Sequence, residues 1–166
     1  PGHTAEIAYK KYGLKVKNEF FNSKYYKRKN FDLVINLTVL EHIIDPVKFL
    51  KGVTSILNDD GKIFIGVPDS SKQLMIGDPA LMNHAHWSYF TKESLVETFN
   101  RVGLNNVCTK SSKSGALYAW GKFGGKQFES NKPNYYDSCQ VVKQFVNKLN
   151  NNIMLISKWV KYQKKN

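Results

Sequence analysis

Two histidines that lie two positions apart, His84 and His86, have the types and spacing best suited to proton chemistry in this chain. In an extended segment, residues two apart point the same way, so the two rings would face one target. A neutral imidazole is a natural base near physiological pH. The pair is therefore expected to meet a substrate. No zinc site is expected from it, because no third ligand is evident in the sequence.

The segment that must position these side chains is built around a strand and a helix. Residues 31–37 are almost uninterrupted apolar and β-branched, which is typical of a strand covered on both faces of a parallel sheet. Asp45 then offers a side-chain cap, and Pro46 suits the first position of a helix. The apolar stripe of this predicted helix repeats at helical spacing and consists of Val47, Leu50, Val53, Ile56 and Leu57.

A turn and a second strand complete this unit. Residues 58–61 predict the turn, and residues 62–67 predict another buried strand. The whole predicts a right-handed βαβ unit. Ligands bind beyond the carboxyl ends of the strands in such sheets, so Asn36, Leu37 and Thr38 are the first place to look for a functional site.

The chain before this unit and directly after it carries further signals. Residues 4–12 predict a helix closed by Gly13, and residues 14–16 predict a short strand. Residues 69–87 have little periodicity and predict a long structured loop, a kind of segment that often serves as a lid or substrate loop.

The next part of the chain predicts a helix and two strands. Thr91 suits the cap of the helix, and Gly103 suits its end. Residues 106–109 and 116–122 predict two strands that run antiparallel across the turn between them. These strands would close one edge of the sheet.

The C-terminal part predicts a linker followed by a long helix. Residues 127–137 are polar and predict a linker, and residues 138–166 predict an amphipathic basic helix. Its apolar stripe consists of Val142, Phe145, Leu149, Ile153, Ile156 and Val160. Three partners for this stripe remain open: the sheet domain, a second subunit in an oligomer, or an anionic membrane surface, which Trp159 and the flanking lysines would suit.

Composition suits one globular domain with a strongly basic surface. The chain of 166 residues has 25 Lys and Arg against 13 Asp and Glu, a formal net charge of +12. The lysines concentrate in residues 24–29 and in the tail after Asp137. Such a field favours anionic partners, but a solvated lysine-rich surface is the preferred explanation, because charge alone says nothing about a fold or a site. Cys108 and Cys139 lie far apart, which favours reduced thiols and a cytoplasmic location.

An ordered series of short motifs resembles the class I S-adenosylmethionine (SAM) dependent methyltransferases. The series comprises the turn and helix of residues 1–8, the strand and helix start of residues 32–46 with the Leu40-Glu41-His42 triplet, the second strand of residues 57–68, and residues 84–104. The resemblance covers residues 1 to about 122. It implies a Rossmann-like, doubly wound α/β sheet, mostly parallel with an antiparallel edge, and SAM as the cofactor.

The family pattern also implies parts that this sequence does not contain. In that family a glycine-rich loop follows the first strand, and an acidic residue ends the second strand; neither precedes Pro1 here. Residues 1–126 are therefore expected to be an N-terminally truncated methyltransferase domain.

The resemblance assigns cofactor-binding roles to two groups of residues. Glu19 and Phe20 would meet the adenine, and either Phe20 or its neighbour Phe21 could instead be ordinary core. Asn36, Leu37 and Thr38 would line the methionine and sulfonium region. The last of the implied cofactor residues is His42, which with Glu41 would either contact the cofactor or brace the loop.

The same resemblance assigns a role to His86. Sugar C-methyltransferases carry Tyr-His-Glu-His at a comparable place, where the second histidine is a base; this chain reads Asn83-His84-Ala85-His86. We predict His86 as the general base with Tyr89 beside it, and Asn83 and His84 as substrate-binding residues.

These expectations define a function and its alternatives. The chain is predicted to methylate oxygen or carbon of a small, sugar-like acceptor that can carry anionic groups. The alternative is a non-catalytic subunit that binds a partner or an anionic surface through its basic C-terminal helix. Nucleic acid is not the expected substrate, because the aromatic-Pro-aromatic signature of amino-group methylation is replaced by residues 36–39.

Overall fold

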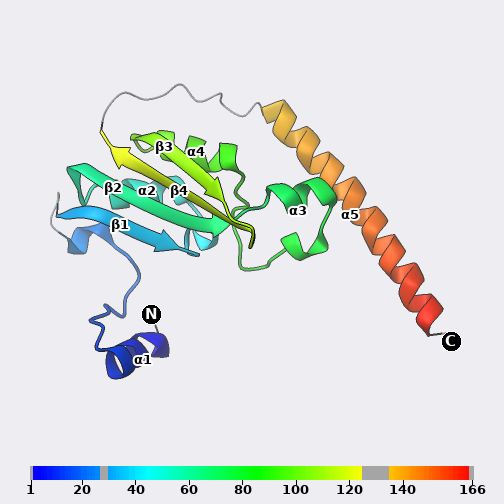
Figure 1. Cartoon of the computed structure of the whole chain (residues 1–166), viewed down its shortest axis with the longest axis horizontal. Coiled ribbons are helices and arrows are strands. Elements are labelled where there is room, and N and C mark those ends of the chain that lie inside the picture. The colour runs from blue at the N-terminus through cyan, green and yellow to red at the C-terminus, as the bar shows by residue number, and fades with distance from the viewer. Residues whose placement is uncertain (1, 27–29, 125–134, 165–166) are drawn as a thin grey trace.

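The computed structural model describes residues 2–26, 30–124 and 135–164. Its centre is a four-stranded sheet in the order β1-β2-β4-β3, in which β1 and β2 are parallel and the other two pairs are antiparallel (Figure 1). The strands are β1 (Phe31–Leu37), β2 (Leu57–Pro68), β3 (Leu104–Ser111) and β4 (Ala116–Phe123). The predicted α/β, Rossmann-like fold with an antiparallel edge is confirmed, but the described sheet is not mostly parallel, because two of its three strand pairs are antiparallel.

Helices and short 3₁₀ turns connect and flank the strands. The α-helices are α1 (His3–Tyr12), α2 (Pro46–Thr54), α3 (Ser71–Ile76), α4 (Lys92–Asn100) and α5 (Tyr135–Gln163). The 3₁₀ turns are η1 (Ser23–Tyr25), η2 (Leu40–His42) and η3 (Pro79–Leu81). No helix among the described residues is long and apolar enough to cross a membrane.

The predicted βαβ unit is β1–α2–β2. The Asp45 carboxylate accepts a hydrogen bond from the Lys48 backbone N–H at 2.8 Å, which caps α2 as expected. The predicted turn at residues 58–61 lies inside β2, because Phe31 pairs with Leu57 but Leu33 already pairs with Lys62. The intervening residues therefore loop out of the ladder as a bulge.

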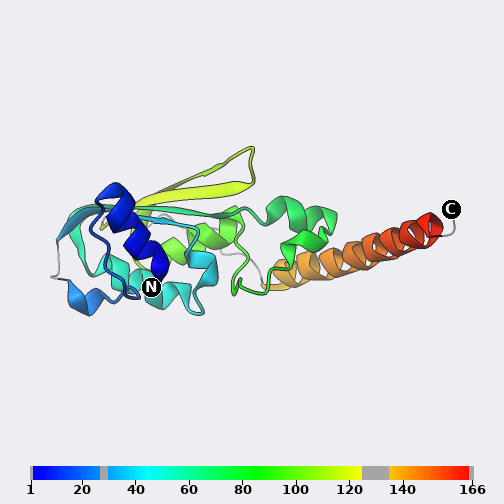
Figure 2. The ribbon, with the colours of Figure 1, turned by 90° about the horizontal axis from the view of Figure 1, so that it is seen from below.

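The hydrophobic core lies between the sheet and the helices α2 and α4, which lie on the same side of the sheet (Figure 2). Its fully buried residues include Leu50 of α2, Ile63 and Ile65 of β2, and Leu95 and Phe99 of α4. On the opposite side, Leu33, Ile35 and Leu37 of β1 are each at least half exposed. The described part of the sheet is thus packed on one face, and the prediction that β1 is covered on both faces is wrong for the described residues.

The predicted strand at residues 14–16 is wrong. Gly13 closes α1 in the left-handed conformation, at φ 65°, as predicted, but the chain then continues without pairing. A short strand persists only where a neighbour accepts its backbone hydrogen bonds. Within the described residues, β1 is an edge strand and residues 14–16 do not reach it. Val16 and Leu37 are therefore not the ends of two adjacent strands.

The loop predicted at residues 69–87 contains α3 and η3. The Asp78 carboxylate accepts from the Ala80 backbone N–H at 2.9 Å, and Pro79 follows at the first helical position, so η3 has a local cause. Helix α3 gains its support from α5, whose Asn152 amide donates to the backbone oxygens of Ile76 and Gly77. A helix that depends on contacts with a distant segment need not show an apolar repeat in its own sequence.

The helix and hairpin after this segment form as predicted. Thr91 caps α4 in a reciprocal capping box with Ser94, and the turn after the helix ends at Gly103 with φ 77°. Strand β3 then pairs antiparallel with β4.

Helix α5 projects away from the sheet (Figures 1 and 2). It begins at Tyr135, three residues before the predicted start, and Phe145 is buried against the body of the protein. Val142 and the side chains beyond Asn152 are exposed, so only Phe145 and Leu149 of the predicted stripe are covered. Most of the predicted linker and residues 27–29 of the first basic cluster lie outside the described residues.

Candidate functional site

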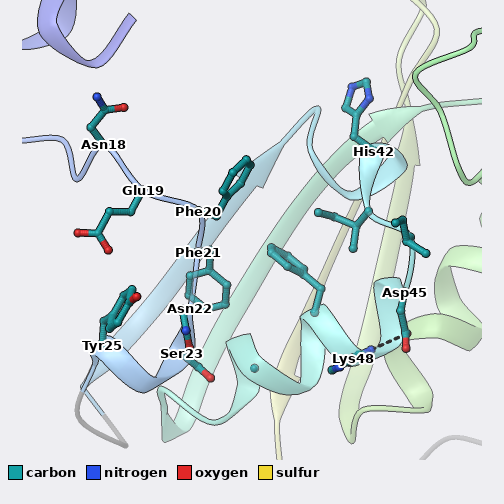
Figure 3. Close-up of a pocket in the computed structure, with 14 residues that line it drawn as sticks. Asn18, Glu19, Phe20, Phe21, Asn22, Ser23, Tyr25, His42, Asp45 and Lys48 are labelled. Atoms are coloured by element: carbon teal, nitrogen blue, oxygen red, sulfur yellow. Dashed lines mark hydrogen bonds between the residues drawn. The ribbon is translucent and has the colours of Figure 1, made fainter. Parts of the chain in front are cut away.

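A cavity of about 870 Å³ opens between the segment after α1 and the start of α2 (Figure 3). One wall comes from residues 18–23 and Tyr25, and the other from residues 42–45 together with Lys48, Phe49 and Gly52. We call this cavity the α2 pocket. It brings together Glu19, Phe20 and His42, three of the residues predicted to bind the cofactor.

The two adjacent phenylalanines of this pocket have different surroundings. Phe21 packs edge-on against Phe49 of α2, with ring centroids 5.3 Å apart, and also stacks on Tyr26 at 6.0 Å. Phe20 is 82% exposed. Phe21 is therefore the packing residue of the pair, and Phe20 is the one that keeps a ring face for a ligand.

The other predicted cofactor residues lie at the tip of β1, outside the lining of the α2 pocket. Thr38 adopts a left-handed conformation, at φ 51°, and its backbone N–H donates to the Gly66 oxygen at 2.8 Å. The Asn36 side-chain oxygen is buried and has no hydrogen-bond partner among the described residues. Leu37 is half exposed. An unsatisfied acceptor at a strand tip is suited to a ligand that donates a hydrogen bond.

A cluster of two histidines and a glutamate lies beside the α2 pocket. The rings of His42 and His86 meet edge-on, with 4.9 Å between centroids and 72° between planes. The Nδ1 atom of His42 lies 2.9 Å from the Ala85 backbone oxygen. Because that oxygen can only accept, Nδ1 carries the proton and Nε2 keeps the lone pair. The Nε2 atom lies 3.8 Å from a carboxylate oxygen of Glu41.

The segment that carries His86 is a tight turn, so the predicted extended geometry is wrong. The His86 backbone N–H donates to the Asn83 oxygen at 3.1 Å, and the Ala85 N–H donates to the Asn83 side-chain oxygen at 3.0 Å. This local hydrogen bonding by Asn83 is typical of turns and competes with an extended chain. His86 consequently meets His42, not His84, which is exposed.

Asn83 and Tyr89 hold the basic nitrogen of His86 in place. The Tyr89 hydroxyl donates to the Asn83 backbone oxygen at 3.1 Å and accepts from its N–H at 3.2 Å. Since the Asn83 side-chain oxygen is already engaged, its amide nitrogen faces His86 Nε2 at 3.3 Å. That nitrogen of His86 therefore accepts, and its lone pair is the basic site. The predicted proximity of these three residues is confirmed.

Glu41 braces the turn that carries His86. Bracing was one of its two expected roles, and contact with the cofactor was the other. Its backbone oxygen accepts from the N–H groups of Trp87 and Ser88 at 2.8 and 3.2 Å. Its side chain is buried, and one carboxylate oxygen has no hydrogen-bond partner among the described residues. The bracing is therefore done by the backbone, and the carboxylate serves no structural contact of this kind.

Comparison with known proteins decides the family. A family model described as a methyltransferase domain matches residues 5–109, which is more than half of the chain. The chain belongs to this methyltransferase-domain family. None of the curated proteins matches it.

Solved structures show the same methyltransferase fold. A Burkholderia thailandensis 1,6-didemethyltoxoflavin-N1-methyltransferase with bound S-adenosylhomocysteine aligns with a TM-score of 0.54 at 20% identity, over 75% of this chain and 58% of that one. A SAM-dependent methyltransferase from Aquifex aeolicus aligns with a TM-score of 0.53 at 9% identity, over 72% and 63%. A Thermotoga maritima SAM-dependent methyltransferase, a possible histamine N-methyltransferase, aligns with a TM-score of 0.50 at 16% identity. The alignment covers 60% of this chain and 59% of that one.

The chain spans less than two thirds of the length of each of these three structures. At such identities the likeness concerns the fold. The roles of individual residues in this methyltransferase domain therefore rest on their geometry in this structure, not on the likeness to these proteins.

The contact between η2 and the turn of residues 83–86 was not expected from the sequence. Its residues are more than forty positions apart, and no local pattern links them. One signal was available, because η2 follows the carboxyl end of β1 and the turn lies in the connection after the carboxyl end of β2. Since these strands are parallel neighbours, their following segments leave the same edge of the sheet.

Proposed function

We propose that this methyltransferase domain transfers a methyl group from SAM to a small-molecule acceptor. One observation carries the proposal: His42 lines the α2 pocket and its ring also contacts His86. The pocket that suits a cofactor and the candidate base His86 are thus both in contact with the side chain of His42. Proximity of this kind is the main requirement of methyl transfer, because the reacting groups must be aligned.

The residues of the α2 pocket suit an adenosyl group. Phe20 offers an exposed aromatic ring that can cover the adenine, and the neighbouring Glu19 offers a carboxylate that can accept from its amino group. The unsatisfied oxygen of Asn36 at the tip of β1 would accept from the ammonium group of the methionine part, with Leu37 and Thr38 beside it. These assignments rest on the chemistry of the donor set and on the bound S-adenosylhomocysteine of one structural neighbour.

SAM, when bound, supplies a methyl group already activated by its sulfonium. The chain then has to orient the acceptor and take up the proton that the acceptor loses. The lone pair on His86 Nε2 is suited to accept this proton, and an acceptor hydroxyl would replace the weak contact with Asn83 at 3.3 Å. Tyr89 maintains the turn that fixes this geometry. His84, exposed on the same turn, is available to bind the acceptor.

A small, sugar-like acceptor methylated on oxygen or carbon is the finer proposal. A single base with an orienting amide suits the removal of one proton from a hydroxyl or an activated carbon. One structural neighbour has a small heterocyclic substrate bound, which is consistent with the size class. The net charge of +12 favours an acceptor that carries anionic groups. Both described cysteines are free thiols, consistent with a cytoplasmic location.

Transfer of a labelled methyl group from SAM tests the acceptor class. The purified protein is incubated with the labelled cofactor and a panel of hydroxylated and sugar-like small molecules, and separately with RNA and DNA. We expect label in the small-molecule fraction. Label in nucleic acid, or in no acceptor class, would overturn the small-molecule proposal.

A second candidate function is binding to an anionic phospholipid surface through α5. Its outer part exposes Ile153, Leu155, Ile156 and Trp159. The tail beyond Asp137 contains six lysines and no acidic residue. Two such helices would repel each other, whereas an anionic surface complements their charge, and a tryptophan suits the interface between water and lipid.

Co-sedimentation with vesicles tests whether α5 binds an anionic phospholipid surface. Vesicles that contain phosphatidylserine should bind the protein, and vesicles of phosphatidylcholine alone should bind it at least tenfold less. Trp159→Ala should weaken binding to the anionic vesicles, with Tyr9→Ala of α1 as the matched aromatic control. Equal binding to both vesicle types, or a concentration-dependent dimer in light scattering that Trp159→Ala abolishes, would contradict the membrane candidate.

A further inference from the structure

We propose that Glu41, His42 and His86 form a binding site for a divalent transition-metal ion of the zinc class. One ligand atom from each of the three residues lies within 4.8 Å of the other two. Two come from η2 and one from the turn that follows the neighbouring parallel strand. Among the described residues this is the one group of three such side chains so close together.

The buried carboxylate of Glu41 is the observation that points to a cation. Its side chain is 2% exposed, and its Oε2 atom has no hydrogen-bond partner in the described part of the protein. The other carboxylate oxygen, Oε1, lies 3.8 Å from Nε2 of His42. A buried carboxylate oxygen that is left without a hydrogen-bond partner is unfavourable, and a bound cation compensates for it directly.

The tautomer of His42 is the one that a metal ligand needs. Its Nδ1–H donates to the Ala85 backbone oxygen at 2.9 Å, which leaves the Nε2 lone pair on the side of Glu41. Histidine ligands in proteins typically donate their other ring N–H to a carbonyl or carboxylate, which fixes the ring orientation. The same backbone contact links His42 to the turn that carries His86.

Two imidazoles and one carboxylate define the class of ion. This donor set suits zinc, iron, cobalt or nickel, whereas magnesium and calcium prefer sites made of oxygen alone. In a tetrahedral site with bonds of about 2.0–2.1 Å, ligand atoms lie about 3.3 Å apart, so the widest pair must close by roughly 1.5 Å. The side chain of His86 would supply this movement by giving up its 3.3 Å contact with the Asn83 amide.

In the tautomer that accepts from Asn83, Nε2 carries the one available ring lone pair of His86, so a metal ion and a proton would compete for it. A bound ion would occupy it, so the metal-loaded and proton-accepting states of this residue are alternatives. The site does not depend on methyl transfer, and it can be tested in the absence of SAM and acceptor.

Binding of Zn²⁺ and Co²⁺ to the whole chain, free of any histidine tag, tests the site. We expect one Zn²⁺ per chain by calorimetry, and Co²⁺ absorption bands typical of tetrahedral nitrogen and oxygen ligands. His42→Asn and His86→Asn should each weaken Zn²⁺ binding at least tenfold, while His84→Asn on the same turn should change it less than twofold. Circular dichroism confirms that the surface variants are folded, and Glu41→Gln extends the test if that variant folds.

Two results would overturn the metal site. One is the absence of Zn²⁺ binding to the unmodified chain at micromolar concentration. The other is a loss of binding in His84→Asn equal to that in His42→Asn, which would indicate adventitious coordination by surface histidines. Neither result bears on methyl transfer, so the metal site and the proposed function can fail separately.

Discussion

The imidazole of His42 lies edge-on against the imidazole of His86, with 4.9 Å between the ring centroids. This contact joins the segments that follow two parallel strands, and it places the proposed base next to the α2 pocket. Since His42 belongs to both, the proposed cofactor site and the proposed acceptor site would be neighbours in space.

Replacement of His86 by glutamine should lower turnover at least tenfold, the low end for loss of a general base. Glutamine can still accept the hydrogen bond from Asn83, but it cannot take up a proton at neutral pH. Steady-state methyl transfer measures the effect. His3→Gln on the exposed helix α1 is the matched control and should retain turnover within twofold. Full activity in His86→Gln would exclude this residue as the base.

Replacement of Phe99 by alanine should destabilise the protein by about 3–5 kcal/mol, the usual cost of deleting a buried phenyl ring. Phe99 is fully buried between α4 and the sheet. Urea unfolding measures the change in the free energy of unfolding. Phe20→Ala is the matched control, because that ring is 82% exposed and its loss should cost less than about 0.5 kcal/mol. Similar losses in the two variants would contradict the packing described for α4.

Removal of the cap on α2 should destabilise the protein by about 1 kcal/mol. Asp45→Ala deletes the acceptor of the Lys48 N–H, and Asp45→Asn keeps an acceptor in the same place. Thermal unfolding should therefore rank the asparagine variant near the original protein and the alanine variant below both. An alanine variant as stable as the asparagine variant would show that the cap contributes nothing.

The stabilising contribution of Asp69 should disappear at low pH. Burial raises the pKa of the Asp69 carboxyl, but hydrogen bonds from Ser111 and Ser71 outweigh it and hold the pKa below its ordinary value of 3.8. Because the folded state favours the ionised form, the contribution is complete above about pH 4 and is lost as the pH falls through the lower folded pKa.

Urea unfolding of the original protein and of Asp69→Asn checks this sign. The difference in free energy of unfolding between them should be largest at pH 7 and should shrink at pH 3. A difference that grows as the pH falls would mean that the folded protein favours the protonated carboxyl.

The βαβ unit could be predicted from the sequence because its signals are local. An apolar run specifies β1, and Asp45 with Pro46 specifies where α2 begins. The predicted strand at residues 14–16 failed because a strand also needs a neighbour, which its own residues do not encode. Likewise, α3 has little periodicity and depends on Asn152 of α5.

The candidate site was predictable in its members but not in its geometry. Glu19, Phe20 and His42 do share a pocket, and Asn83, His86 and Tyr89 do meet. The pairing of His86 with His42 depends on a turn that Asn83 creates through its own side chain. An asparagine before two histidines was a readable turn signal, and it outweighs the preference for an extended chain.

Binding of S-adenosylhomocysteine, the demethylated cofactor, tests the central claim most directly. Calorimetry should show one binding site per chain, with the affinity lowered at least tenfold by Phe20→Ala and left within twofold by Phe123→Ala at the far end of β4. This difference is expected because Phe20 lies in the α2 pocket and Phe123 does not. No binding to the unmodified protein, or equal affinity in the two variants, would contradict the account.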